Sequence, residues 1–179
     1  MIFTHDTAES LEAGVFLANS ALEPDTLETM DQLESFFARF EYSGPPPKEA
    51  DLIQVRNIRG ALFQLFKATR DSAVPLVNAI LAEQKAVPQV VRHGGLDWHI
   101  HATSDESPLA TRILVESAMA MIDVIRSDEM RRFDRCQMHD CEGIVFDLSR
   151  NRSKKYCSLT CTNRAAVQAY RARKTKQSR

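Results

Sequence analysis

The sequence has 179 residues, 44% of them hydrophobic, and a formal net charge of -1 at pH 7. This length and composition predict a globular protein with one core-bearing domain and a small appended module. No segment reaches the roughly 20 uncharged apolar residues of a membrane helix, because Glu116 and Asp123 interrupt the best candidate, residues 113–125. The N-terminus also lacks the basic and apolar regions of a signal peptide, which predicts a cytoplasmic protein.

Charge divides the chain into two parts. Residues 131–179 contain 13 Lys and Arg against 4 Asp and Glu, a net charge of +9, whereas residues 1–130 carry -10. We therefore expect an acidic domain over 1–130 and a basic module over 131–179 that faces a polyanion such as DNA. A merely solvated surface or a frayed tail is the alternative.

The acidic part is predicted to be mostly helical, because apolar residues recur at helical spacing in four segments. The second helix is expected to open at a capping box formed by Asp25 and Glu28. Proline at position 47 suits the first turn of the third helix. The segments are 7–22, 25–40, 47–68 and 75–85.

A β-hairpin follows, in which residues 87–92 and 96–102 flank the turn 93–95. His99 and His101 alternate along the second strand and share one face. A metal site or a proton shuttle is one interpretation of this pair, and exposed polar positions on a half-buried hairpin are the favoured one. Ser107-Pro108 then begins a long helix, and the domain boundary is expected near 127–132.

All four cysteines lie in the basic module, as Cys136, Cys141, Cys157 and Cys161 in the pattern C-x4-C-x15-C-x3-C. Two close pairs suit a tetrahedral four-thiolate site for one structural Zn²⁺. Ordinary buried thiols and two disulfides are the alternatives, but neither needs the cysteines to lie so close in the sequence, and disulfides require an oxidising compartment. His139 lies between the first two cysteines and is expected to face solvent.

The module is expected to form a knuckle, a hairpin and a helix, a treble-clef-like plan. The hairpin would pair the apolar run 143–147 with a return through 155–157, across a polar turn at 149–153. After Cys161 the pattern becomes helical. The predicted fold is therefore mainly α with a small β-hairpin, followed by a four-cysteine zinc finger.

The run from Cys136 through Phe146-Asp-Leu-Ser-Arg-Asn-Arg-Ser153 to Cys161-Thr-Asn-Arg164 resembles the CGNR zinc finger of bacterial transcription regulators. The upstream chain is similar to the ABATE domain that accompanies this finger, through Phe16-Leu-Ala-Asn-Ser20, Val55-Arg-Asn-Ile-Arg-Gly-Ala-Leu62 and Ile113-Leu-Val-Glu-Ser-Ala118. The resemblance implies a stress-induced regulator. One departure is Thr162, where the family has glycine, so any role that needs a left-handed backbone there is in doubt.

The candidate DNA-binding residues lie on the turn, the return segment and the helix of the finger. Asn163 and Arg164 are placed to reach base edges from the first turn of the helix, while the others would contact phosphates. The set is Arg150, Arg152, Lys154, Lys155, Asn163, Arg164, Arg171, Arg173 and Lys174.

Asn19, Arg56 and Arg59 are weaker candidates for a small-ligand pocket in the helical domain, with capping and ion pairing the favoured alternative. Motifs typical of nucleophilic, phosphate-binding or zinc-peptidase sites are absent from the sequence, so no enzyme is expected. We predict a zinc-dependent DNA-binding regulator whose N-terminal domain senses a ligand or forms a homodimer. A zinc-stabilised module that binds RNA or a protein is the alternative.

Overall fold

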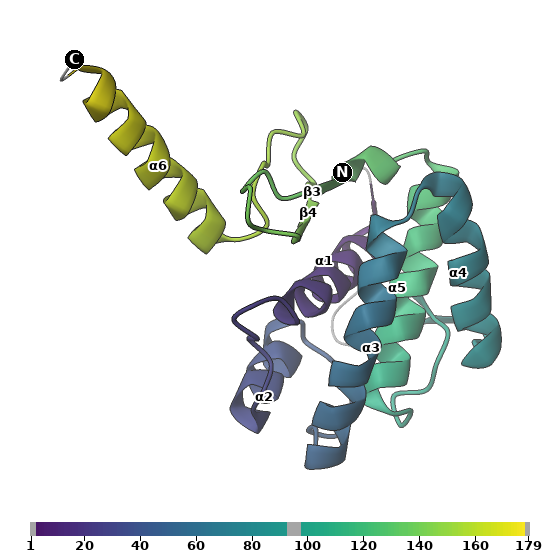
Figure 1. Cartoon of the computed structure of the whole chain (residues 1–179). Helices are drawn as coiled ribbons and strands as arrows, with labels where there is room; N and C mark the ends of the chain where they lie inside the picture. The colour runs from purple at the N-terminus through teal and green to yellow at the C-terminus, as the bar shows by residue number, and fades with distance from the viewer. Residues whose placement is uncertain (1–2, 93–97, 178–179) are drawn as a thin grey trace.

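The computed structural model describes residues 3–92 and 98–177. In the described part, six helices and two small antiparallel hairpins confirm the predicted fold class (Figure 1). The elements are α1 (His5–Ser20), α2 (Met30–Arg39), α3 (Glu49–Lys67), α4 (Arg70–Glu83), β1 (Gln89–Val91), β2 (His99–His101), α5 (Leu109–Arg126), a 3₁₀ turn (Met130–Arg132), β3 (Phe133–Arg135), β4 (Ile144–Phe146) and α6 (Leu159–Gln177).

Three helices, α1, α3 and α5, pack side by side and carry the main core (Figure 1). Their apolar stripes meet at fully buried side chains such as Leu11, Leu62 and Met121. Gly14 lets α1 approach α5 closely, because a Cβ at this position would lie 2.6 Å from Ser117 Oγ and 2.7 Å from the Phe66 ring. None of the helices in the described ranges has the length and apolar character needed to cross a bilayer.

Two helix starts differ from the sequence prediction. The capping box of α2 is formed by Thr29 and Gln32, not by Asp25 and Glu28. Asp25 instead accepts a hydrogen bond from the Leu27 backbone and pairs with arginines of α3. Helix α4 begins at Arg70 behind a Thr69 cap, five residues before the predicted start, so Pro75 lies inside it. In both cases a threonine hydroxyl satisfies the backbone amide three positions on.

The predicted hairpin forms, with Val90 opposite Ile100 and Gln89 opposite His101. Its predicted turn, residues 93–95, lies outside the described residues. The favoured interpretation of its histidines is wrong for His99, which is buried, with its ring 4.9 Å from that of His101. Trp98, Val90 and Ile100 are large apolar residues of the hairpin that are exposed.

The finger's strand β4 pairs with β3, the segment before the first cysteine, and not with the predicted return at 155–157. The register sets Phe133 opposite Phe146. Residues 147–155 form a loop instead, because the Asp147 carboxylate accepts hydrogen bonds from the backbone of Ser149 and Lys154. Strand β3 has no alternating apolar pattern in the sequence, because two charged residues follow Phe133.

The finger's hairpin is packed into the helical core rather than held apart from it. Phe133 stacks between Phe66 of α3 and Phe146, with ring centroids 5.4 and 4.7 Å away. The Asn19 amide of α1 donates to the Ile144 carbonyl at 2.8 Å and accepts from the Ile144 N–H at 2.7 Å. Apolar packing therefore continues across the boundary predicted near 127–132.

Candidate metal centre and basic helix

The four cysteine sulfur atoms converge on one point, all within 4.8 Å of one another. Cys136 and Cys141 flank the turn between β3 and β4, Cys157 ends the loop that follows, and Cys161 lies in the first turn of α6. The measured separations are 3.6 Å from Cys141 to Cys157 and 3.8 Å from Cys157 to Cys161. All four thiols are free, and a disulfide would need about 2.05 Å between sulfurs.

These separations match a metal site. Four sulfurs around one zinc ion at about 2.3 Å form a tetrahedron whose edges are about 3.8 Å long. The backbone also faces the sulfurs, since Gly143 N–H donates to Cys141 Sγ at 3.4 Å and Cys157 N–H donates to Cys136 Sγ at 3.5 Å. Such N–H groups stabilise the negative charge of a thiolate, and the thiolate is the form of cysteine that binds metal.

Glycine is required beside the cluster. A Cβ at position 143 would lie 2.6 Å from Cys157 Sγ and 3.2 Å from Cys141 Sγ, so any larger residue would displace the sulfurs. Burial raises the pKa of the Cys157 thiol above its usual range, an effect that a bound cation would reverse. Elsewhere in the described residues, no other group of three or more Cys, His, Asp or Glu is placed to hold a metal ion.

A small apolar shell encloses the site. Met138, Val145 and Ala165 pack around the two buried cysteines, Cys136 and Cys161. His139 is exposed, with Nδ1 3.9 Å from Asp140, and is not among the converging ligands. The position is closed by four sulfurs, so the metal it suits is structural rather than catalytic.

Comparison with protein families assigns both parts of the chain. Residues 132–174 match the CGNR zinc finger, and residues 12–128 match the ABATE family, described as "Putative stress-induced transcription regulator". The chain belongs to the ABATE family. This confirms the resemblance seen in the sequence, and no curated protein matches the chain. The four cysteines of the finger are positioned to bind one structural zinc ion. The family description is that of a regulator, not of an enzyme.

The finger's basic residues occupy two regions. On the loop, all four basic residues, Arg150, Arg152, Lys154 and Lys155, are exposed. Two of them also have partners: Arg152 lies 3.9 Å from the Glu129 carboxylate, and the Lys154 ammonium donates to the Phe146 carbonyl. On α6, Asn163, Arg171, Arg173 and Lys174 are exposed.

Arg164 has a partner within the finger. It forms an ion pair with Asp140 of the knuckle, and this contact holds the pKa of Asp140 below its usual range. The pair connects the N-terminal part of α6 to the loop between the first two cysteines. Thr162 is helical, and its hydroxyl donates to the Ser158 carbonyl, so this position needs no left-handed backbone.

The three candidate ligand-binding residues of the ABATE domain have structural contacts. Arg59 forms a two-pronged pair with Asp25 at 2.8 and 2.9 Å, Arg56 lies 3.4 Å from the same carboxylate, and Asn19 binds Ile144. Hydrogen bonding by Arg59 lowers the pKa of Asp25 to about 2. None of the three lines the cavity between α1 and α5 or the smaller one beside β3. Their ligand role stays a prediction.

Sequence reasoning missed a second group of polar residues, Tyr42, Arg112 and Glu116, which line a cavity in the ABATE domain. One signal was present, because Glu116 interrupts the apolar run 113–125 of α5. A carboxylate at a position that the helical period assigns to the protein interior indicates a polar site.

Proposed function

We propose that the protein is a zinc-dependent DNA-binding transcription regulator that acts in the cytoplasm. The finger contacts DNA through α6 and the loop 147–155, and the ABATE domain senses a small ligand or forms a homodimer. The single observation that carries this proposal is α6 itself. It has five Lys and Arg and no Asp or Glu, and every residue from 166 to 175 is exposed.

Helix α6 extends away from the rest of the molecule (Figure 1). Isolated helices are marginal in water, because most helical stability in proteins comes from packing. The zinc site and the Arg164–Asp140 pair hold only the N-terminal end of α6, up to Arg164. A solitary basic helix held rigidly at one end fits a groove lined with phosphates, and its diameter of about 10–12 Å matches the major groove.

The distribution of charge also favours binding of DNA by α6. The ABATE part, residues 1–130, carries -10 and repels a phosphate backbone, so the +9 finger would face DNA with α6 leading. Within the finger we assign phosphate contacts to Arg150, Lys155, Arg171, Arg173 and Lys174, and base contacts to Asn163. Arg152, Lys154 and Arg164 contact other residues of the protein, and we propose that they position the loop and the helix.

Charge reversal on α6 tests this proposal. Replacing Arg171 and Lys174 with Glu should weaken binding to all duplex sequences and reduce the slope of log K against log salt by about 0.9 for each lost phosphate contact. The matched control is Lys67→Glu with Lys85→Glu, which reverses two exposed charges on the ABATE domain and should leave binding unchanged. Equal losses in both double variants would mean that only overall charge matters.

A protein partner is the second candidate, because Val167 and Tyr170 are exposed apolar side chains three positions apart on α6. Val167→Ser with Tyr170→Ser separates the two functions. Unchanged DNA affinity in this variant, with loss in the charge-reversed one, supports the DNA proposal. Absence of DNA or RNA binding by the zinc-loaded protein would exclude it and favour the protein-partner function.

A further inference from the structure

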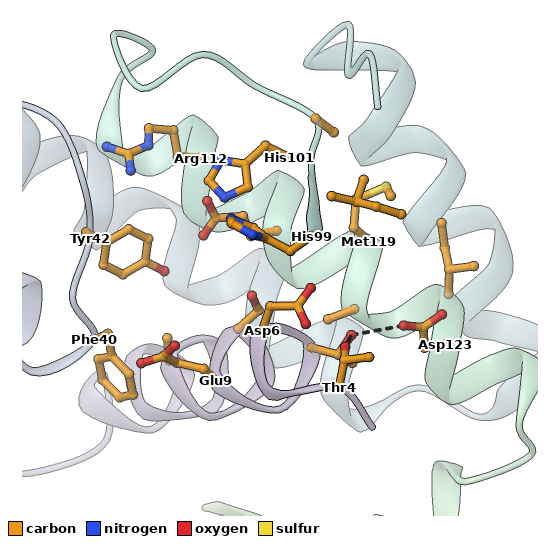
Figure 2. Close-up of a pocket in the computed structure, with 18 of the residues that line it drawn as sticks. Thr4, Asp6, Glu9, Phe40, Tyr42, His99, His101, Arg112, Met119 and Asp123 are labelled. Atoms are coloured by element: carbon orange, nitrogen blue, oxygen red, sulfur yellow. Dashed lines mark hydrogen bonds between the residues drawn. The ribbon is translucent and has the colours of Figure 1, made fainter. Parts of the chain in front are cut away.

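A cavity of about 410 Å³ lies inside the ABATE domain, between α1, α5 and the β1–β2 hairpin (Figure 2). Every residue that lines it comes from the ABATE part of the chain, so it is separate from the zinc site. Asp6 and Glu9 of α1 lie on one side, and His99 and His101 of β2 lie on the other. Its volume is in the range of small-molecule sites, about 300–1,000 Å³.

The carboxylate of Glu116 faces this cavity without a hydrogen bond or ion pair from the described residues. Arg112, an arginine of α5 that lines the same cavity, is committed elsewhere: it donates to the Ser43 carbonyl at 2.7 Å and to the Ser43 hydroxyl at 3.0 Å. Arg112 is also buried and lies over the Tyr42 ring at 5.6 Å. Glu116 is half-buried, and a carboxylate that is partly removed from water and lacks a counter-ion is costly in a folded protein.

Aromatic side chains complete the wall. Tyr42 is held by packing against Phe36 and Phe37, with ring centroids 5.6 and 6.1 Å away, and its hydroxyl is turned towards the cavity (Figure 2). Trp98 lies at the rim with two-thirds of its surface exposed (66%). Aromatic faces carry negative electrostatic potential and favour cations.

The charged groups around the cavity are unequal in number. Five carboxyl groups line it, those of Asp6, Glu9, Glu41, Glu116 and Asp123, against the guanidinium groups of Arg112 and Arg126 and the imidazole groups of His99 and His101. Asp123 already accepts a hydrogen bond from Thr7. We propose that this cavity binds a small organic cation, an amine with an apolar body, whose ammonium group pairs with Glu116 beside the Tyr42 hydroxyl.

Other ligand classes fit less well. An anion would meet an excess of carboxylates, and Arg112 is already bonded to Ser43. A metal ion would need three or more converging ligands, and the cysteines are the one such group in the described residues. Burial raises the pKa of Glu116 to about 7, and an ammonium group would favour its ionised form again.

This inference names the ligand class for the proposed sensing role, and its test is independent of DNA. The zinc-loaded full chain is titrated at neutral pH with three probes of one shape: 2-phenylethylamine, 2-phenylethanol and phenylacetate. Calorimetry and thermal melting should show binding by the amine, at least tenfold tighter than by the alcohol, and none by phenylacetate. Equal binding of all three, or preference for phenylacetate, would overturn the proposal. Loss of DNA binding, by contrast, would leave this result unaffected.

Two variants locate the site. Glu116→Gln removes the charge and keeps the shape of the side chain, so the variant should fold and, without ligand, melt at a higher temperature than the natural chain. Its affinity for the amine should fall by at least tenfold. Tyr42→Phe should lower the affinity for the amine severalfold. The control is Glu83→Gln, an exposed carboxylate at the end of α4, which should bind as the natural chain does. Unchanged amine binding in both Glu116→Gln and Tyr42→Phe would refute the site.

Discussion

At the scale of single residues, Gly143 shows how closely the metal centre depends on backbone placement. Its N–H donates to Cys141 Sγ, and the space where a side chain would begin is occupied by Cys157 Sγ. Glycine here serves close approach, because its backbone conformation is one that any residue adopts. The four ligands could be predicted from spacing alone, but this fifth position could not, since nothing in a linear sequence shows which residue the sulfurs face.

We predict that Gly143→Ala lowers zinc affinity by at least tenfold, because the new methyl group displaces Cys157 and distorts the tetrahedron. Competition with a colorimetric chelator measures this. Gly60→Ala is the control, since a Cβ at that exposed position on α3 meets nothing within 4 Å and should only raise helix stability, by about 1 kcal/mol at most. Identical zinc affinity in the two variants would show that the cluster tolerates the methyl group.

Glu116 gives a residue-scale prediction about pH. Burial, reinforced by Asp105 and Glu9 and opposed by Arg112, raises its pKa from 4.5 to about 7. Between these values the folded state binds more protons than the unfolded state, so the free energy of unfolding falls as pH rises through this window. The contribution is on the order of 2–3 kcal/mol.

Urea denaturation at a series of pH values tests this prediction. Glu116→Gln should remove most of the decline between pH 4.5 and 7 and exceed the natural chain in stability above that window. Glu83→Gln should reproduce the natural profile. A natural profile that stays flat or rises across the window would contradict the raised pKa.

At the scale of elements, the sequence predicted what periodicity and spacing encode and missed what tertiary contacts decide. The helices from α1 to α5 follow from their apolar stripes. The start of α2 was misplaced because Asp25 and Thr29 are both good caps, and the choice was made by Arg59, which is 34 positions from Asp25 and engages it. The pairing of β4 was wrong for a similar reason. The Asp147 carboxylate accepts hydrogen bonds from the backbone of Ser149 and Lys154, which holds the following residues in a loop, and β4 pairs instead with β3 at Phe133.

At the scale of the whole molecule, the sign of the charge changes near residue 130, but the apolar core does not end there. Charge separates an acidic from a basic part, as the sequence predicted. Packing does not stop there, because β3 and β4 place Phe133, Ile144 and Phe146 against the helical core. Helix α6, by contrast, is exposed from residue 166 to residue 175. This arrangement couples the metal centre to the domain that would sense a ligand, since Ile144 is bonded to Asn19 and directly follows Gly143.

We therefore predict that a fragment ending at residue 127 is less stable than the full chain. Removal of β3 and β4 uncovers Phe66, which is 1% exposed in the full chain, and leaves Asn19 without Ile144. Loss of this aromatic packing should cost several kcal/mol, comparable to about 3–5 kcal/mol for truncating a buried phenylalanine. The midpoint of urea unfolding, followed by helical circular dichroism, measures the difference. The full chain with Cys157→Ser and Cys161→Ser is the control, because it loses zinc but keeps both strands. If the strands pack as described, this control should fall between the fragment and the natural chain. A fragment as stable as the full chain would show that the ABATE domain closes its core without the finger.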